Sequence, residues 1–377
     1  MIDSAQLFEL NKVLKEFLNP ERVVDVEELK GGHINRTYLI TMPEAKYILQ
    51  KINHHVFTSP YGMMHNISEI TEYIRYKLIF EGLDPDRHIL YTVKTIYGQL
   101  LCIRDDSYWR CMKYIDNATA YNTIESKELM YEIGSAVGNF QFLLEGFHTR
   151  ILDDTIKHFH DTPYRYNTFN DVVNLDKVHR VKNCQEEINF IRENSENFGV
   201  VVRAIDDKII PRRVTHNDTK SSNILIDNDT HKALCLIDLD TVMRGSLVYD
   251  YGDALRIGCS TAEEDEKDLS KVSINFEYFE AFNRGFLKEV INIITPEEVK
   301  LLYDGFFLMT IECGLRFLTD YLDGDRYFRI YYREHNLVRA RNQIAMTKEI
   351  MKNKEKLTQI IKDCLRDLEY SDRYFEW

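Results

Sequence analysis

Three oxygen-bearing residues stand at a spacing that suits the transfer of a phosphoryl group. Asn223 lies five residues after Asp218, and Asp238 lies twenty residues after it. Phosphoryl transfer needs a carboxylate that orients the attacking hydroxyl and accepts its proton, and hard oxygen ligands that hold magnesium on the phosphates. The order His-x-Asp-x-x-x-x-Asn with a later Asp matches the catalytic loop and metal-binding Asp of kinases. We therefore predict that Asp218 is the catalytic base and that Asn223 and Asp238 bind Mg2+.

The same residues have a simpler interpretation, an Asn- and Asp-rich turn followed by an acidic strand end. Either half of the motif alone would leave that interpretation open. Both halves occur in order, beside three short β-rich runs at 213–215, 223–226 and 233–237. This arrangement favours catalysis. We interpret His216 as a structural residue of the loop, and Asp250 and Asp253 as carboxylates that brace it by hydrogen bonds.

The sequence also resembles a known superfamily, that of the aminoglycoside phosphotransferases and choline kinases, and within it the N-acetylhexosamine 1-kinases. The superfamily resemblance rests on His216-x-Asp218 with Asn223 and Asp238. The resemblance to the sugar kinases rests on longer runs: His-Asn-Asp-Thr-Lys at 216–220, Cys-Leu-Ile-Asp-Leu-Asp-Thr-Val-Met at 235–243, Tyr-Asp-Tyr-Gly-Asp-Ala-Leu-Arg at 249–256, Gly-Leu-Arg-Phe-Leu-Thr-Asp at 314–320 and Gly-Asp-Arg-Tyr-Phe at 324–328. It implies ATP and Mg2+ as cofactors and a small sugar as the substrate.

The resemblance further implies which residues contact the sugar. By resemblance we assign substrate binding to six residues: His33, Asp218, Asp238, Asp240, Arg316 and Tyr327. Spacing alone would instead pair Arg316 with Asp320 or Asp325 and pack Tyr327 in the core. A guanidinium fork and a phenol suit the recognition of hydroxyl and amide groups. We therefore expect Arg316 and Tyr327 in the hexosamine pocket.

Nucleotide binding is expected mainly in the first third of the chain. We assign it to Gly32, Asn35, Lys51, Met112 and Tyr114. The glycine pair at 31–32 is a candidate turn over the phosphates, although it lacks the full Gly-x-Gly-x-x-Gly and an ordinary turn would look the same. Lys51 is the candidate cation, with Glu69 or Glu72 as its partner. Because strand residues alternate, Gln50 and Lys51 face opposite sides, and the sequence leaves open which of them faces the phosphates.

The expected fold is α+β and resembles protein kinases, with a small β-rich N-terminal lobe (1–112) and a larger, mainly α C-terminal lobe (113–377). The first lobe is predicted to hold helices at 7–17 and 67–78 and β-rich runs at 22–29, 37–41, 46–52, 88–96, 99–103 and 109–115. Helical patterns dominate the second lobe, at 124–147, 171–196, 276–292, 296–321 and 333–367. Because no low-complexity linker occurs, we expect a tight hinge at 112–116.

Composition limits the possible partners. The net charge of −13 argues against nucleic acid or an anionic membrane as the main partner. No stretch reaches the roughly 18 uncharged apolar residues that would span a bilayer. Seven cysteines occur without a Cys-x-x-Cys pair, which predicts reduced, mostly buried thiols and a cytoplasmic location. No obligatory protein partner is evident.

Departures from the protein-kinase pattern point to a small substrate. Asn217 stands in place of the usual Arg, Asp-Leu-Asp replaces Asp-Phe-Gly, and no Ala-Pro-Glu follows. Without an activation segment a peptide has no evident docking site. Phosphorylation of an N-acetylhexosamine at C1 is the leading hypothesis. A kinase of another acceptor (choline, an aminoglycoside or another sugar) is the alternative, and a catalytically inactive binding module is disfavoured by the intact motif.

Overall fold

The computed structural model describes residues 4–29 and 34–370, which divide into two compact units. The first, here called the sheet unit, holds the described residues up to Ala120 together with Gly146–Lys157 and Leu225–Arg244. The second, the helical unit, holds Tyr121–Glu145, His158–Ile224 and the described residues from Gly245 onward. Each unit is described by itself. The lobe boundary between 112 and 113 stays a prediction.

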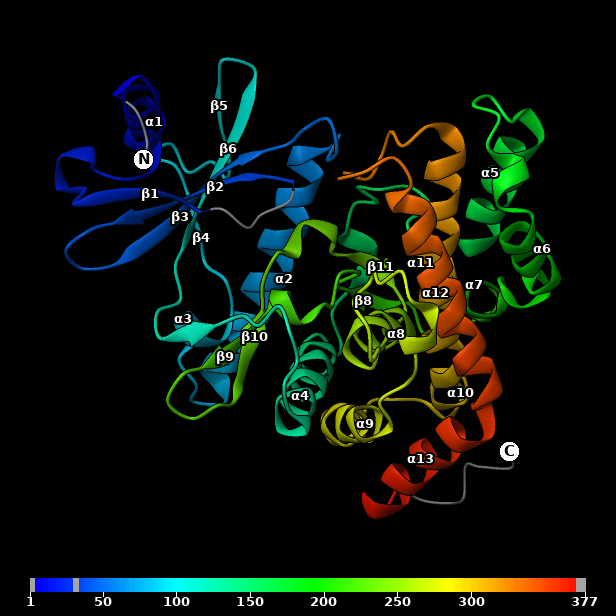
Figure 1. Cartoon of the computed structure of the whole chain (residues 1–377). Coiled ribbons are helices and arrows are strands. Elements are labelled where there is room, and N and C mark those ends of the chain that lie inside the picture. The colour runs from blue at the N-terminus through cyan, green and yellow to red at the C-terminus, as the bar shows by residue number, and fades with distance from the viewer. Residues whose placement is uncertain (1–3, 30–33, 371–377) are drawn as a thin grey trace. The chain divides into compact units, whose positions relative to one another are not determined.

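The sheet unit is built on an antiparallel sheet with the strand order β1-β2-β3-β6-β4, and β5 also pairs with β6 (Figure 1). The strands are β1 (Asp25–Leu29), β2 (Arg36–Thr41), β3 (Lys46–Ile52), β4 (Thr92–Val93), β5 (Cys102–Arg104) and β6 (Ser107–Lys113). The register places Thr37 opposite Gln50, and Gln50 opposite Arg110. Lys51, one residue later, stands opposite Trp109.

The two faces of this sheet differ in what packs on them. Helix α1 (Ser4–Phe17) places Leu10, Val13, Leu14 and Phe17 in one apolar cluster with Tyr38, Leu49, Cys111 and Trp109 of the sheet. Because side chains alternate along a strand, Lys51 shares the face covered by α1. Gln50, Arg110 and Met112 therefore share the opposite face.

Helix α2 (Pro60–Phe80) connects the sheet unit's separate segments. The side-chain amide of Asn66 donates to the carbonyls of Asp153 and Val242 and accepts from the Asp153 N–H, at 2.8–2.9 Å. The sheet unit also includes α3 (Pro85–His88), β7 (Ala118–Thr119), β9 (Ile224–Asp227), β10 (Ala233–Leu236) and the 3-10 turn η6 (Leu239–Thr241). Strands β10, β9 and β7 form a small sheet of their own. The segment that contains Asp238 thus belongs to the sheet unit.

The helical unit contains most of the described helices (Figure 1). They are α4 (Lys127–Leu143), α5 (Thr162–Leu175), α6 (Gln185–Glu193), α7 (Val200–Asp206), α8 (Leu247–Gly258), α9 (Phe276–Val290), α10 (Pro296–Lys300), α11 (Leu302–Asp323), α12 (His335–Lys352) and α13 (Lys354–Asp367). Strand β8 (Arg213–Thr215) leads into the 3-10 turn η5 (Ser221–Asn223), and β11 (Met243–Gly245) precedes α8. A Cβ added to Gly252 of α8 would lie 2.1 Å from the Gly305 carbonyl oxygen of α11. Because only glycine permits such a close approach, α8 packs tightly against α11 at this point.

The predicted fold class is confirmed: a small antiparallel-sheet unit accompanies a larger helical one. The strand predicted at 88–96 is wrong for most of its length, because α3 occupies Pro85–His88 and β4 is only Thr92–Val93. Asp84 caps that helix by accepting from the Asp86 N–H, and Pro85 suits the first helical turn. The helical pattern at 171–196 is interrupted, since Asp176 ends α5 in the left-handed conformation at φ 36°.

Six of the seven cysteines are buried and Cys313 is half-buried, which confirms that most of the thiols are buried. Among the described residues, the helices are each too short or too polar to cross a membrane.

Candidate active site

Residues 216–223 form a loop that two carboxylates of α8 hold by its backbone. The carboxylate of Asp250 accepts from the N–H groups of His216 and Asn217, at 2.9 and 2.8 Å. Asp253 accepts from the Thr219 N–H at 3.0 Å. The predicted bracing role of Asp250 and Asp253 is therefore confirmed.

The second residue of the loop explains one departure from the protein-kinase motif. Asn217 has φ 67°, in the left-handed region that Asn tolerates better than most residues. Asp250, which cradles this turn, is fully buried. Burial raises the pKa of Asp250 to about 6, although the two backbone N–H donors oppose the increase.

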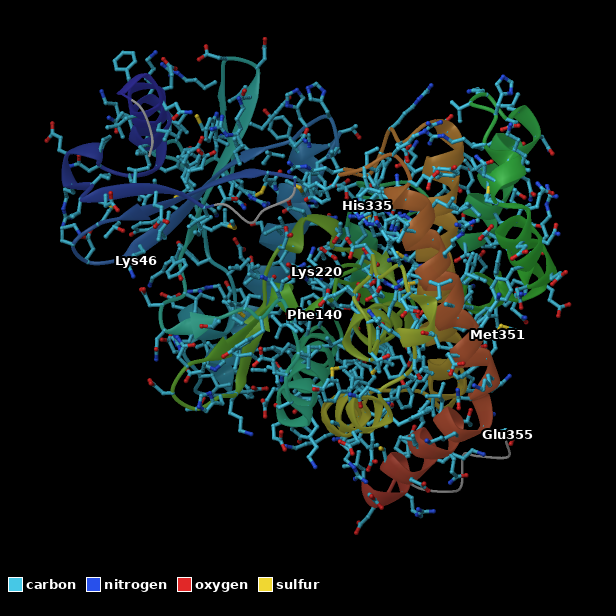
Figure 2. The ribbon with its side chains drawn as sticks, in the orientation of Figure 1. Lys46, Phe140, Lys220, His335, Met351 and Glu355 are labelled. Carbon is cyan, nitrogen blue, oxygen red and sulfur yellow. The ribbon has the colours of Figure 1, made fainter. Side chains whose placement is uncertain are left out.

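His216 has a structural role, as predicted. It is fully buried, and its ring packs edge to face against Phe140 of α4, which is labelled in Figure 2, with centroids 5.8 Å apart. Its Nδ1 accepts from the Asp218 N–H at 3.2 Å. The histidine thus fixes the backbone of the residue that we predict to be the base.

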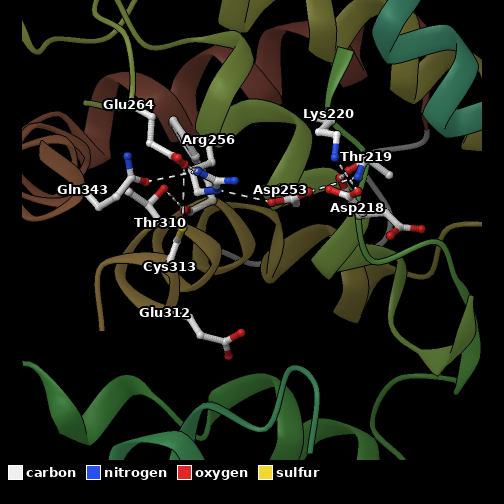
Figure 3. Close-up of polar contacts among 12 residues, drawn as sticks. Asp218, Thr219, Lys220, Asp253, Arg256, Glu264, Thr310, Glu312, Cys313 and Gln343 are labelled. Carbon is white, nitrogen blue, oxygen red and sulfur yellow. Dashed lines mark hydrogen bonds and ion pairs between the residues drawn. The ribbon is translucent and has the colours of Figure 1, made fainter. Parts of the chain in front are cut away.

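The carboxylate of Asp218 accepts from two donors of its own loop, one of which, Lys220, is labelled beside it in Figure 3. Its Oδ2 accepts from Lys220 Nζ at 2.8 Å and from Asn223 Nδ2 at 2.9 Å, while its side chain stays 33% exposed. Burial acts to raise the pKa of Asp218, but the charge and hydrogen bond of Lys220, with His216 and Asn223, bring the pKa below its ordinary value. Asp218 is therefore a carboxylate at neutral pH. Lys220 was not singled out from the sequence, although its place two residues after Asp218 was the available signal.

Asn223 and Asp238 each carry an oxygen of the kind that binds magnesium. The Asn223 amide gives its N–H to Asp218, which leaves its carbonyl oxygen directed elsewhere. Asp238 is exposed and holds the left-handed conformation, at φ 60° and ψ 56°. An amide oxygen and a carboxylate are the hard ligands that Mg2+ takes. Asn223 belongs to the helical unit and Asp238 to the sheet unit, and their joint role stays a prediction.

Asp240 lies in a buried polar network of the sheet unit. Its Oδ1 is 2.5 Å from Arg110 Nη1, and both side chains are 2% exposed. Its Oδ2 accepts from Asn35 Nδ2 at 2.8 Å. Arg110 also donates through Nε to Gln50, at 2.9 Å. The structure thus brings together the predicted residues Asn35 and Asp240, and adds Arg110, which no sequence pattern indicated.

Lys51 lies on the other face of the sheet, with its Nζ over the Trp109 ring, 5.8 Å from the centroid. The predicted partnership with Glu69 or Glu72 is wrong, because His65 contacts Glu69 and Lys94 contacts Glu72, at 3.8 and 3.7 Å. The cause is strand alternation: Gln50, not Lys51, shares the face of Arg110.

The remaining nucleotide assignments are placed only in part. Met112 shares the face of Gln50 and is buried. Tyr114 follows the end of β6, and its N–H donates to the Lys46 carbonyl at 2.9 Å. Gly32 and His33 lie outside the described residues. The roles assigned to these four residues stay predictions.

Arg316 and Tyr327 come together in the helical unit. The Arg316 guanidinium lies 5.4–5.8 Å from the ring centroids of Phe159, Tyr327 and Phe328. Within the described residues, no carboxylate forms an ion pair with Arg316. Tyr327 is 63% exposed. The alternative of a salt bridge and a core aromatic is therefore wrong.

Asp320, the expected partner of Arg316, instead shapes the turn that follows α11. Its carboxylate accepts from the backbone N–H groups of Arg326, Tyr327 and Phe328, at 2.8–2.9 Å, and from the Asn336 side chain. Asp320 thereby presents Tyr327 beside Arg316. The sequence had shown this aspartate in the 314–320 run without indicating its task.

A buried glutamate lies near the same arginine. Glu312 accepts from Thr162 Oγ1 at 2.6 Å and contacts His160 Nδ1 at 2.8 Å. Burial acts to raise the pKa of Glu312, but the charges of His160 and Arg165, with two hydrogen bonds, lower the pKa to about 2. Burial lowers the pKa of Arg165, and the charge of Arg316 adds to that effect while Glu312 opposes it. Glu312 also forms an ion pair with Arg165, with Oε1 3.5 Å from Nε, so the two guanidiniums share this region with one carboxylate.

Solved structures with a similar fold are kinases and phosphotransferases. A microcompartment-associated aminopropanol kinase is 14% identical, with a TM-score of 0.54, over 93% of this chain and 98% of that one. An aminoglycoside phosphotransferase from Alicyclobacillus acidocaldarius is 12% identical, with a TM-score of 0.57, over 92% and 97%. A GDP complex of an aminoglycoside 2'-phosphotransferase variant is 11% identical, with a TM-score of 0.51, over 95% and 97%. At these identities the likeness shows a kinase-like fold.

The sequence gives the family as well. Residues 25–272 match the phosphotransferase enzyme family, and this matched stretch includes the 216–223 loop and Asp238. The chain belongs to this family.

Proposed function

We propose that this phosphotransferase transfers the γ-phosphoryl group of ATP to the anomeric hydroxyl of an N-acetylhexosamine. Asp218 orients the C1 hydroxyl and takes its proton as the new oxygen–phosphorus bond forms. The bond between the β-phosphate oxygen and the γ-phosphorus breaks, and ADP leaves. A low pKa suits Asp218, because in a loose transition state the carboxylate mainly positions the nucleophile.

Asn223 and Asp238 would hold the magnesium ion, which supplies charge neutralisation on the phosphates. Lys220 holds Asp218 in place and adds positive charge beside the transferred group. The use of a nucleotide is supported by the GDP complex of a structural neighbour, so both ATP and GTP belong in the assay.

One observation supports a neutral sugar over a cationic acceptor: the surroundings of Arg316. Its guanidinium lies 5.4–5.8 Å from the centroids of three aromatic rings, but its N–H groups have no carboxylate partner within the described residues. Arg316 lies near Arg165, since burial and then the charge of Arg316 lower the pKa of Arg165, and Glu312 is already bound by His160, Thr162 and Arg165. A quaternary or primary ammonium would meet the positive charge of Arg316 there. Hydroxyl and acetamido oxygens would accept from the Arg316 fork.

The test is an ADP-release assay with magnesium, ATP or GTP, and a panel of acceptors. The panel holds N-acetylglucosamine, N-acetylgalactosamine, glucose, galactose, choline, ethanolamine, 1-amino-2-propanol and kanamycin. We expect the highest kcat/KM with an N-acetylhexosamine, and a product whose phosphorus couples to the anomeric proton in the NMR spectrum. A higher kcat/KM with any amine would refute the sugar assignment while leaving the phosphotransferase intact.

Arg316→Ala sharpens this test. The lost hydrogen bonds would lower kcat/KM for the sugar by roughly 5- to 150-fold, which corresponds to about 1–3 kcal/mol, and KM for ATP would stay close to wild type. Arg284→Ala is the matched control, because Arg284 forms only surface pairs with Glu280 and Asp367. Equal losses for both substrates with a lowered melting temperature would give Arg316 a structural role instead.

A further inference from the structure

The sheet unit contains a buried arginine that the proposed chemistry does not use. Arg110 of β6 and Asp240 of η6 form an ion pair, and each side chain is only 2% exposed. Removing two charges from water costs several kcal/mol per ion, which the pair regains only with good geometry and further hydrogen bonds. Such a pair indicates a positional requirement.

Further contacts hold the guanidinium of Arg110. Its Nε donates to Gln50 Oε1 at 2.9 Å, and Gln50 in turn donates to Thr37 Oγ1 at 3.0 Å. Met64 of α2 places its sulfur 3.7 Å from Nη1. The arginine is thus held directly by Gln50 of β3 and Met64 of α2, and indirectly by Thr37 of β2.

The other end of the pair controls a strained segment. Asp240 lies in the single 3-10 turn that begins directly after Asp238, and Asp238 has the left-handed backbone conformation. A non-glycine residue in that conformation persists only where its surroundings enforce it. The Asp240 carboxylate forms an ion pair with Arg110 through Oδ1, which has no hydrogen-bond partner among the described residues, and accepts a hydrogen bond from Asn35 through Oδ2. Two contacts of one side chain thus restrain the turn after Asp238.

We propose that Arg110 is a positioning residue: acting through Asp240, it fixes the backbone that directs the Asp238 carboxylate to the metal–nucleotide complex. Kinases commonly carry a cation on the third strand. Here Gln50 occupies the corresponding face of β3, Lys51 lies on the face covered by α1, and the buried cation comes from β6. The inference rests on the proposed role of Asp238, but not on the identity of the acceptor.

The test measures nucleotide binding, not turnover. Titration calorimetry with ADP, with and without Mg2+, gives the factor by which Mg2+ strengthens binding. Loss of a group that orients a metal ligand typically weakens metal affinity by 10- to 100-fold. We therefore expect Arg110→Met to reduce that factor by roughly tenfold or more, and to change metal-free ADP affinity by less than about threefold. Arg110→Lys keeps the charge but not the Gln50 bond, and it should recover part of the loss.

Two controls separate positioning from other roles. Arg75→Met removes a partly buried arginine that pairs with Asp86 at 2.8 Å in the same unit, and it should leave the Mg2+ factor unchanged. In an Asp240→Asn background, Arg110→Met should cause little further loss, because both act through one pair. Full additivity would mean that Arg110 contacts the nucleotide directly, and would overturn the inference.

Comparison of wild type with the Arg110 variants separates failure of the positioning role from failure of the proposed function. If wild type shows no Mg2+-dependent ADP binding, the proposed function fails. If wild type shows it and folded Arg110→Lys and Arg110→Met retain the full factor, the positioning role alone is refuted. Melting curves identify a variant that does not fold, in which case Arg110→Lys decides the question.

Discussion

The 216–223 loop and the turn at Asp238–Thr241 are each held by buried charged side chains of other elements, but these side chains are carboxylates for the loop and a guanidinium for the turn. Two buried carboxylates of α8 accept from backbone N–H groups of the 216–223 loop. The turn after Asp238 is held through one side chain, Asp240, by a buried guanidinium. The two carboxylates fix the backbone path of several loop residues, whereas the Arg110–Asp240 ion pair fixes the orientation of a single turn. Variants of Asp218 and of the carboxylates that brace its backbone should therefore affect turnover, and variants of the turn should affect metal and nucleotide binding.

The largest expected effect is on turnover, in Asp218→Asn. The amide keeps the shape of the side chain but removes the charge and the proton acceptor, so kcat should fall by roughly 10²-fold or more. Initial rates at saturating ATP and acceptor give the value. A variant that retained most of its kcat would show that Asp218 is not the base.

Asp250→Asn should have the next largest effect. An amide has one acceptor oxygen, so it cannot accept from both His216 and Asn217 as the carboxylate does, and the loop would shift. Misplacement of a catalytic group by about 1 Å can cost 10²-fold, so we expect kcat to fall by about 10- to 100-fold. A normal kcat would mean that the loop does not need this cradle.

The pH dependence follows from the same group. Protonation of Asp250, with its pKa raised by burial to about 6, would remove one acceptor from the loop, and kcat should fall as the pH is lowered from 7 to 5. Because the folded-state pKa lies above the unfolded value, this protonation favours the folded state. Asp250 therefore predicts an acidic loss of activity without a matching loss of melting temperature. If kcat and the melting temperature fell together at low pH, and did so in Asp250→Asn as well, another group would be responsible for the acidic loss of activity.

Asp253→Asn should have a smaller effect, because Asp253 accepts a single loop hydrogen bond, from Thr219. An amide oxygen can still accept from that N–H. The lost charge weakens the contacts to Arg256, which also pairs with Glu264 and contacts Gln343 (Figure 3). A loss of about 1 kcal/mol, or roughly fivefold in kcat, is expected. If this variant were worse than Asp250→Asn, the Arg256 network would be the main support of the loop.

The contrast between the two segments also explains what the sequence could predict. Asp250 and Asp253 follow the loop residues that they bind by 33–34 residues and belong to one recognisable motif, so their bracing role was predictable. Arg110 precedes Asp240 by 130 residues and stands in an ordinary strand. Alternation predicted that Gln50 and Lys51 face opposite ways, but only the packing of α1 shows which face each takes.

Local patterns misled where a carboxylate had several available partners. The spacing predicted an ion pair between Arg316 and Asp320, yet Asp320 accepts from three backbone N–H groups of the turn at 326–328. Backbone donors held close in sequence compete well against a side chain that must lose rotamer freedom. Glu312 and His160, 152 residues apart, form a contact that no spacing rule would suggest.

The division of labour between the two segments is the central claim, and one titration tests it most directly. ADP binding with and without Mg2+ is measured in wild type, Asp218→Asn and Asp238→Ala, with melting curves as the folding control. We predict that Asp218→Asn keeps the Mg2+-dependent gain within about threefold of wild type, while Asp238→Ala loses it. An unchanged gain in Asp238→Ala, or a loss confined to Asp218→Asn, would contradict the account.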